Sequence, residues 1–320
     1  MKRPGLEKYT ESRPLMGTIV KVTACVDKEK KKQIKDVYDK VWEKLAYLES
    51  NLGIYNEAGD VYRINHSLEK EIEVSEDTYA LIASAKGYNL ITLGAFNIAV
   101  YPLIELWKDS EKNQVLPQNK MIEDRLSLID NDNIELLGNN KIKLLDKEAK
   151  IDLGAIAPGY SADVASSLLR ESGITSFFVD AGGEIFASGE NCEGKPWKAG
   201  IYDPISKENL LRVIHLKDNA VSTSGDYERY FNINDRKYSY IIDPRRGLPE
   251  EAVISATVIA PKAVAADALS TAMCILGDEE RLNLMEELGD GYASLVLKKT
   301  PEGNLEVVES PNFKKFISKE

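Results

Sequence analysis

Cysteine and histidine are scarce in this sequence, and their scarcity argues against two kinds of site. The three cysteines, Cys25, Cys192 and Cys274, are too few and too scattered for a disulfide framework or a zinc site. We therefore expect Cys25 and Cys274 to pack as small apolar side chains. The only histidines are His66 and His215, so a metal site built on several imidazoles is close to excluded.

Long apolar runs are also missing. No segment approaches 18 consecutive apolar residues, and residues 1–15 carry charges where a leader would have an apolar centre. We therefore expect neither a membrane span nor a leader in the chain as given, and a leader removed earlier stays an open alternative. Residues 1–15 are interpreted as a polar N-terminal arm, and residues 16–320 as a single domain.

An excess of basic residues is missing as well. The chain has 41 Lys and Arg against 52 Asp and Glu, which gives a formal charge of -11, and no stripe of basic residues stands out. This balance disfavours nucleic acid as a partner, because binding to the phosphate backbone depends on clustered positive charge. With 320 residues, 43% of them hydrophobic, the chain is long enough for one large core.

The spacing of apolar residues predicts both helices and strands. Residues 18–26 alternate as in a strand, residues 34–52 have helical spacing that ends at Gly53, and residues 263–276 form an apolar helix. Residues 108–147 are interpreted as a polar, hairpin-rich cover. Further strands are expected at residues 177–187, 197–202, 211–216, 220–223, 238–243 and 253–259. The mixture predicts an α+β fold with mixed, mostly antiparallel sheets and flanking helices.

Residues 151–183 combine a strand, a turn rich in small residues, a helix and a second strand. Small residues over 154–159 would let the backbone approach a ligand, and Pro158 suits the first turn of a helix ending near Gly173. The N–H groups of that helix start would face a phosphate, and Asp152 would hold a cation or a ribose hydroxyl. The alternative is an ordinary glycine-rich connection, because no standard nucleotide-binding pattern occurs.

Tyr55 is an aromatic residue within a polar loop, residues 54–60. It is either an anchor that holds the loop against the core or a platform on which a planar ligand stacks. From this loop alone the anchor is favoured.

Asp267 and Thr271 stand four residues apart in the apolar helix, so their oxygens leave the same face. A carboxylate, a hydroxyl and a backbone carbonyl, here that of Ala155, suit Mg²⁺, which keeps other positions for water and phosphate. The alternative is a polar face exposed to solvent.

Several short motifs, taken together and in order, resemble the FAD:protein FMN transferases of the ApbE family from Met16 to about Gly277. Each motif is weak by itself, and their number and order carry the resemblance. They are Met16-Gly17-Thr18, Ile54-Tyr55, Arg63-Ile64-Asn65, Gly94-Ala95-Phe96-Asn97, Asp152-Leu153-Gly154-Ala155-Ile156-Ala157, Gly182-Gly183, Thr223-Ser224-Gly225-Asp226-Tyr227, Ile242-Asp243-Pro244-Arg245 and Ala266-Asp267-Ala268-Leu269-Ser270-Thr271.

The resemblance implies two interleaved lobes around an FAD cleft and Mg²⁺ held by Ala155, Asp267 and Thr271. The family moves the FMN half of FAD onto a Ser or Thr hydroxyl of a target protein and releases AMP, usually outside the cytoplasm on a lipid anchor. The residues implied to bind FAD are Met16, Tyr55, Ala95, Phe96, Asn97, Asp152, Pro158 and Ile241.

The chain departs from the family pattern at four positions. Asn97 stands where an Asp is usual, Pro158 where a Lys or another polar residue is common, and Tyr240 and Arg246 where the pattern has His and Thr. The family His is the expected general base or phosphate contact, so Tyr240 is the candidate catalytic residue here. A tyrosine with a pKa near ~10 is a poor base at neutral pH, although it donates a hydrogen bond.

Three functions follow from these residues. The first is a Mg²⁺-dependent flavin transferase acting on a target protein. The second is a relative that binds FAD or hydrolyses its diphosphate with weak or no transfer to protein. The third is a flavin redox protein, which would not need the metal pair Asp267 and Thr271.

Overall fold

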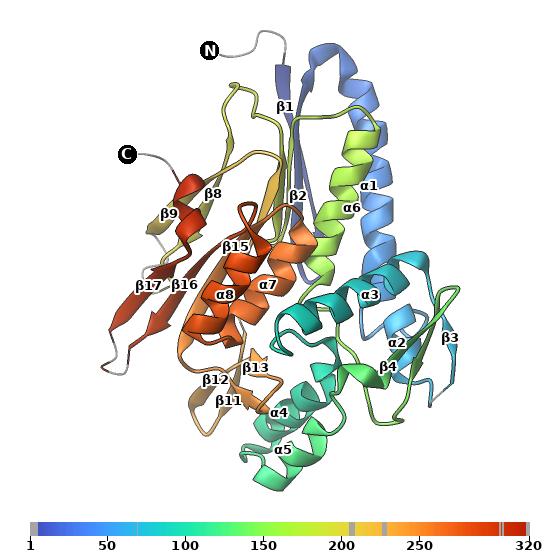
Figure 1. Cartoon of the computed structure of the whole chain (residues 1–320). Helices are drawn as coiled ribbons and strands as arrows, with labels where there is room; N and C mark the ends of the chain where they lie inside the picture. The colour runs from blue at the N-terminus through green and yellow to red at the C-terminus, as the bar shows by residue number, and fades with distance from the viewer. Residues whose placement is uncertain are drawn as a thin grey trace.

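The largest element of the protein is an antiparallel sheet of eight strands (Figure 1). The computed structural model describes residues 6–68, 70–204, 209–225, 229–300, 302 and 304–317. Every neighbouring pair in the sheet is antiparallel, which confirms the predicted fold class. In spatial order the strands are β1 (Leu6–Leu15), β2 (Thr18–Asp27), β6 (Phe177–Ala181), β7 (Ile185–Ser188), β10 (Asn219–Gly225), β15 (Val253–Ala260), β16 (Ala293–Lys299) and β17 (Leu305–Glu309).

Strand β1 covers most of the stretch that the sequence sets apart as a polar arm. It pairs with β2 along its whole length, from Leu6 opposite Asp27 to Leu15 opposite Thr18. Residues 1–5 lie outside the described residues. The two turn residues, Met16 and Gly17, have φ of 56° and 70°, the left-handed conformation that matches the twist of a two-residue hairpin.

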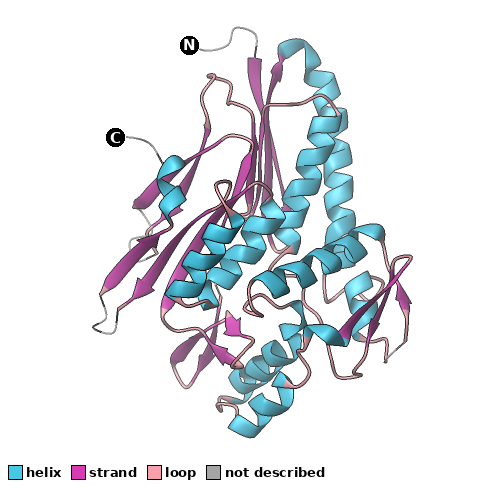
Figure 2. Ribbon diagram, viewed as in Figure 1, coloured by secondary structure: helices cyan, strands magenta, loops and turns pink. Residues whose placement is uncertain are grey.

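Long helices cover the sheet (Figures 1 and 2). Helix α7 lies over β10 and β15, and α6 packs against α7, α1 and the strands β6 and β7. Every residue of β15 is buried, with Val258 in the larger core cluster and Ile259 in the smaller one, so both faces of this strand are covered. The helices are α1 (Lys31–Leu52), α3 (Glu76–Ile91), α6 (Ala157–Glu171), α7 (Ala263–Ile275) and α8 (Asp278–Leu288).

A smaller core lies on the other face of the sheet. The hairpin of β8 (Trp197–Tyr202) and β9 (Leu210–Leu216) packs there with η4 (Pro311–Lys315). The sequence predicts that the strand over residues 211–216 continues the main sheet. In the structure it belongs to this separate two-stranded sheet.

A disulfide joins Cys25 to Cys192, so the expectation that Cys25 packs as a free apolar side chain is wrong. The two residues are 167 positions apart in the sequence, and their Cα atoms lie 5.3 Å apart. Strand β6 pairs with both β2 and β7, which brings Cys25 near the turn that follows β7. This proximity depends on the strand order, which cysteine spacing does not reveal. Cys274 is buried and forms no disulfide, in agreement with the expectation for this residue.

We expect reduction of this disulfide to lower the free energy of unfolding by about 2–5 kcal/mol, because the cross-link restricts a long loop of the unfolded chain. Urea unfolding with and without dithiothreitol measures the change. A Cys25→Ser, Cys192→Ser double variant should start from the lower stability and show no further response to the reductant. Equal stability of the reduced and oxidised wild type would contradict a stabilising role.

Two groups of small elements lie beside the main sheet and its helices. One contains α2 (Asp60–Asn65), β3 (Ile72–Glu73), η3 (Asn131–Asn133), β4 (Ile134–Gly138) and β5 (Lys141–Leu144). The other contains η2 (Ile98–Val100), α4 (Tyr101–Asn113), α5 (Asn119–Leu126), β11 (Tyr230–Ile233), β12 (Arg236–Ser239), β13 (Ile242–Asp243) and β14 (Leu248–Pro249), and a short η1 (Lys28–Lys30) precedes α1.

Helix α4 and helix α5 correct the interpretation of residues 108–147 as a hairpin-rich cover. Residue 108 lies inside α4, and only β4 and β5 form a hairpin in this region. One face of α4 is buried, with Trp107 donating a hydrogen bond to the carbonyl of Gly247 at 3.0 Å. Among the described residues, no helix combines the length and apolar character that crossing a bilayer requires.

Candidate functional site

A cleft of about 680 Å³ lies where segments far apart in the sequence converge. Its size falls within the range of small-molecule sites. The eight residues predicted to bind the cofactor all line it, namely Met16, Tyr55, Ala95, Phe96, Asn97, Asp152, Pro158 and Ile241. Tyr240, Ala155 and Thr271 line it too, whereas Asp267 does not.

The turn between β1 and β2 forms one edge of the cleft. The backbone N–H of Met16 donates a hydrogen bond of 2.6 Å to the carboxylate of Glu49 on α1. Glu49 also lines the cleft. The helix therefore fixes the position of the hairpin tip.

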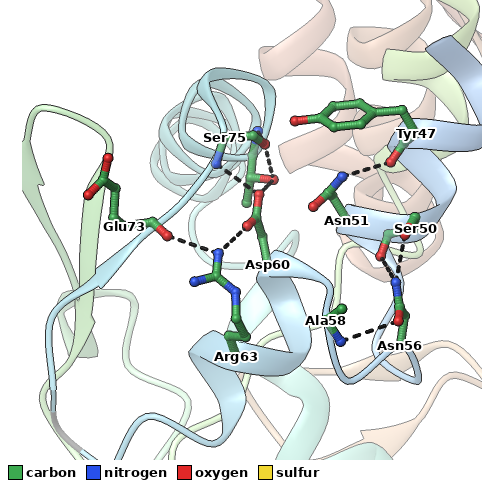
Figure 3. A network of polar contacts seen from close by, with 10 residues as sticks. Tyr47, Ser50, Asn51, Asn56, Ala58, Asp60, Arg63, Glu73 and Ser75 are labelled. Atoms are coloured by element: carbon green, nitrogen blue, oxygen red, sulfur yellow. Dashed lines mark hydrogen bonds and ion pairs between the residues drawn. The ribbon is translucent and has the colours of Figure 1, made fainter.

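Asn56 holds the loop that carries Tyr55 (Figure 3). The Asn56 amide donates to the carbonyl and the hydroxyl of Ser50 at 2.8 and 2.6 Å, and its oxygen accepts the N–H of Ala58 at 3.3 Å. Tyr55 is 79% exposed. A loop anchor would be buried, so the anchor interpretation is wrong, and the ring is free to stack on a ligand.

Arg63 of the Arg63-Ile64-Asn65 motif holds neighbouring elements together (Figure 3). Its guanidinium donates to Asp60 at 2.5 Å and to the carbonyl of Glu73 at 2.9 Å. Asp60 also accepts from the N–H of Ser75 and the hydroxyl of Thr78, at 2.9 and 2.7 Å. Burial acts to raise the pKa of Asp60, but these hydrogen bonds outweigh it and lower the pKa. The network ties α2 and β3 to the start of α3.

Asn65 of the same motif fixes the start of the small-residue turn. Its amide donates to the carbonyl of Ile151 at 2.9 Å, and its oxygen accepts the N–H of Ile151 at 2.8 Å. The next residue, Asp152, donates its N–H to the carbonyl of Ile98 at 2.8 Å. These three hydrogen bonds set the position at which Asp152 enters the cleft.

Asn97 has a structural task that an aspartate would not perform. Its amide donates to the carbonyl of Ile129 at 2.7 Å, and its oxygen accepts the N–H of Ala99 at 2.8 Å, which caps η2. A carboxylate has no proton to donate to Ile129. The Asn at this position, where the family pattern has Asp, therefore makes a hydrogen bond to Ile129 that an ionised Asp could not make.

Asp152 is half-buried in the cleft, and its carboxylate accepts the N–H of Gly154 at 2.8 Å. Burial raises the pKa of Asp152, while the hydrogen bond and the charges of Lys108 and Arg229 act to lower it. The positive charges of Lys108 and Arg229 are thus close enough to Asp152 to stabilise its ionised form.

The start of α6 does not offer the free N–H groups that the sequence predicts. Pro158 has none, Ala157 and Tyr160 donate to the carbonyls of Leu153 and Ile156, and Gly159 donates to Asp267. Each N–H of this first turn therefore has a partner within the protein. A phosphate in the cleft must be neutralised by other groups.

Gly159 allows α6 and α7 to approach each other closely. A Cβ at this position would lie 2.5 Å from the carbonyl oxygen of Ala263 and 2.6 Å from the Cβ of Asp267. The sequence predicts that the small residues of this turn let a ligand approach the backbone closely. At Gly159 the close approach is to the neighbouring helix.

The two helices cap each other. Asp267 on α7 accepts the N–H of Gly159 at 2.8 Å, and Asp163 on α6 accepts the N–H groups of Ala263 and Val264 at 2.8 and 3.0 Å. Asp267 is 4% exposed, which rules out the alternative of a solvent-exposed polar face. Burial raises the pKa of Asp267, the Gly159 N–H acts to lower it, and the charge of Asp163 raises it further.

Thr271 is the only residue of α7 that is not buried, and it lines the cleft. Its hydroxyl lies 3.1 Å from that of Ser224, which lies 2.8 Å from that of Ser270. Asp226 and Tyr227, the next residues of that motif, lie outside the described residues. Among the described residues, no three His, Cys, Asp or Glu side chains lie together so that they could hold a metal ion. A metal held here would rest on one carboxylate, a hydroxyl and a carbonyl.

Tyr240 and Ile241 reach the cleft because the strand predicted over residues 238–243 is interrupted between β12 and β13. The N–H of Tyr240 donates to the carbonyl of Arg229 at 3.4 Å, and that of Ile241 donates to the hydroxyl of Ser239 at 3.1 Å. The first bond continues the register of β11 and β12, and the second holds the backbone where β12 ends.

The Tyr240 ring stacks on Phe231 with centroids 5.0 Å apart. Burial raises the pKa of Tyr240, Lys108 acts to lower it, and Asp152 raises it. The phenol is therefore protonated at neutral pH and serves as a hydrogen-bond donor. Arg246, the other departure from the pattern near this position, is exposed and is not among the residues lining the cleft.

Two cations at the cleft were not predicted. Arg229 lines it, and Lys108 lies at its rim on α4. Tyr101, Glu105 and Lys108 recur at helical spacing, so one face of α4 presents them together. The sequence contains this spacing, but it indicates a shared face only if residues 101–113 are first assigned to a helix.

Comparison with known proteins supports the resemblance drawn from the motifs. The model of the ApbE family matches residues 16–296. An FAD:protein FMN transferase of Vibrio cholerae is 30% identical over 98% of this chain and 96% of that protein. One of Salmonella typhimurium is 29% identical over 94% of this chain and 87% of that protein.

Solved structures agree. The crystal structure of the ApbE protein from Thermotoga maritima matches with a TM-score of 0.86 and 30% identity, covering 98% of this chain and all (100%) of that one. The flavin transferase ApbE from Vibrio cholerae matches with a TM-score of 0.84 and 27% identity, with 98% and 100% covered.

Proposed function

The chain belongs to the ApbE family, and we propose on this premise that it transfers FMN from FAD to a Ser or Thr hydroxyl of a target protein. The acceptor oxygen forms a bond to the FMN phosphorus, the bond from that phosphorus to the AMP oxygen breaks, and AMP leaves. The hydroxyl proton passes to a base or to solvent. The observation that carries this proposal is the convergence of the eight predicted FAD-binding residues on one cleft.

The donor set at the foot of the cleft fits Mg²⁺. The N–H of Gly159 donates a hydrogen bond to Oδ2 of the Asp267 carboxylate. In the described part of the chain no hydrogen bond to Oδ1 is found, so this oxygen could bind a metal ion. Thr271 and Ala155, whose hydroxyl and carbonyl would complete the set, both line the cleft. These hard oxygen donors are few, which suits an ion that keeps water and phosphate ligands. When bound, Mg²⁺ would neutralise charge on the diphosphate.

The protein's own side chains would then orient the reactants. Tyr55 offers an exposed ring for stacking, and Tyr240 offers a protonated hydroxyl. Asp152, held by Asn65 through Ile151 and by Gly154, would fix a polar group of the nucleotide. Positioning of this kind supplies much of the rate in phosphoryl transfer.

Transfer is tested by incubating the protein with FAD, Mg²⁺ and peptides that each carry one Ser or Thr, followed by mass spectrometry. The proposal predicts a peptide that gains one FMN group, together with an equal amount of AMP. AMP and free FMN in equal amounts, with every peptide unmodified, would contradict transfer.

That contradicting outcome is the signature of a second candidate function, hydrolysis of the FAD diphosphate. One observation favours it: Tyr240, with its raised pKa, stands where the family pattern has His. In this case AMP release would not depend on the acceptor peptide.

Tyr55→Ala should weaken FAD binding by about 1–3 kcal/mol, if its ring stacks as aromatic side chains do on nucleobases. Calorimetry measures the affinity. The matched control is Tyr202→Ala, because Tyr202 is also exposed, at 60%, but lies on β8 and does not line the cleft. Equal FAD affinity of the Tyr55 variant and the wild type would refute stacking.

We also propose that the protein works outside the cytoplasm, as the family resemblance implies. The Cys25–Cys192 disulfide supports this, because such bonds persist in oxidising compartments. Alkylation of free thiols before cell lysis, followed by mass spectrometry of tryptic peptides, should recover the linked pair. Recovery of Cys25 and Cys192 as alkylated thiols would contradict the proposed location.

A further inference from the structure

Lys108 lies at the rim of the cleft among three tyrosines. Its ammonium is 3.4 Å from the hydroxyl of Tyr55 and 5.5 Å from the ring centroid of Tyr101, and it interacts with the hydroxyl of Tyr240. Tyr55 and Tyr240 both line the cleft. The charge of Lys108 is thus held beside the cleft by neutral groups.

Among the described residues, no carboxylate forms an ion pair with the Lys108 ammonium, although its charge acts on Asp152. A second lysine on the same ring makes the contrast clear. Lys150 lies 5.9 Å from the Tyr101 centroid, but both oxygens of Glu105 lie within 2.7 and 2.8 Å of its ammonium. Glu105 therefore neutralises Lys150, while Lys108 keeps its charge available.

Lys108 is also protonated at neutral pH. Its partial burial acts to lower the pKa, and the three tyrosines raise it above the ordinary value. A half-buried cation without an acidic partner is unfavourable unless polar groups or an anion compensate it. Tyrosine hydroxyls and ring faces do so only in part.

A diphosphate in the cleft would need positive charge, which Arg229 in the lining and Lys108 at the rim can both provide. Every N–H in the first turn of α6 has a partner within the protein, Pro158 provides no side-chain donor, and Asp152 adds a negative charge. Lys108 already acts on the charge of Asp152 across the cleft wall. Its flexible stem lets the ammonium reach a phosphate oxygen close to Tyr240.

We propose that Lys108 is a substrate-binding residue that donates a charge-assisted hydrogen bond to the diphosphate of the bound dinucleotide, with Tyr55 and Tyr240 holding its ammonium at the rim. This inference rests on the proposed function. It assigns the recognition of negative charge to α4 and not to the start of α6.

The test compares Lys108→Met with Lys150→Met in calorimetric titrations with FAD and with riboflavin, which lacks phosphate. A charge-assisted hydrogen bond contributes about 1.5–3 kcal/mol, so Lys108→Met should weaken FAD binding about 10- to 100-fold. Riboflavin binding should change by no more than about twofold, the usual range for a substitution away from a contact. Lys150→Met should change neither, and Lys108→Arg should keep FAD affinity within about tenfold because the charge remains.

Unchanged FAD affinity of Lys108→Met would overturn the inference. Equal weakening of FAD and riboflavin would overturn it as well, because Lys108 would then support the tyrosines and not the phosphates. Failure of the proposed function is a separate result: the wild type would then bind FAD but leave every Ser or Thr peptide unmodified.

Discussion

Replacement of Asp267 with Asn should abolish Mg²⁺-stimulated release of AMP from FAD. Loss of a carboxylate ligand removes several kcal/mol of charge stabilisation, so we expect a fall in rate of about 10²–10⁴. Asn keeps an oxygen that accepts the N–H of Gly159, so the junction of α6 and α7 keeps its hydrogen bond. HPLC of AMP with Mg²⁺ and with EDTA measures the loss.

The same variant should be folded, and the pKa of Asp267 gives a check. Burial raises this pKa, so the protonated carboxyl favours the folded state below the ordinary value, and that contribution is lost as the pH rises through the raised value. Asn lacks this titration. In EDTA at pH 8 the melting temperature of Asp267→Asn should therefore equal or exceed that of the wild type.

The matched control is Asp163→Asn, which changes the other carboxylate at the junction. Asp163 caps α7 from α6 and does not belong to the proposed ligand set. It should lose stability, because one amide oxygen replaces two acceptor oxygens, and keep its response to Mg²⁺. Full Mg²⁺-stimulated turnover by Asp267→Asn would contradict the metal site.

Tyr240→His should raise the rate of FMN transfer at neutral pH. A positioned base contributes about 10²–10⁴, and burial raises the pKa of Tyr240, so almost none of the phenol is ionised near pH 7. The wild-type rate should increase with pH up to that raised pKa, because the phenolate fraction grows. The histidine variant should instead level off near pH ~7.

Tyr238→His provides the control for this substitution. Tyr238 is half-buried beside Trp107, with ring centroids 5.6 Å apart, and does not line the cleft. It should leave the pH profile unchanged. A wild-type rate that is already fast and flat with pH, with no gain from Tyr240→His, would show that another group supplies the base.

Local patterns predicted the helices α1, α6 and α7 and most strands, but not α4 and α5. Helices α1 and α7 follow from helical spacing, and β2 follows from alternation. All residues predicted for the site except Asp267 line one cleft, and the Arg63-Ile64-Asn65 motif fixes neighbouring backbone segments. The network of Asp60 and Arg63 and the clamp of Asn65 on Ile151 show this physical role.

The features that sequence did not predict depend on contacts between distant segments. The Cys25–Cys192 bond needs the strand order, and the role of Gly159 needs the approach of α7. Lys108 was missed because α4 carries many polar residues, although one face of it is buried. The break after Tyr240 includes a local hydrogen bond from the Ile241 N–H to the Ser239 hydroxyl, which alternation does not encode.

The most direct test of the proposed reaction is the amount of AMP released from FAD by the purified wild-type protein, measured by HPLC with Mg²⁺ and with excess EDTA. The structure and the family lead us to expect AMP with Mg²⁺, more of it when an acceptor Ser or Thr peptide is present, and none in EDTA. FAD that stays intact with Mg²⁺ and acceptor peptide, or equal AMP release in EDTA, would contradict Mg²⁺-dependent transfer.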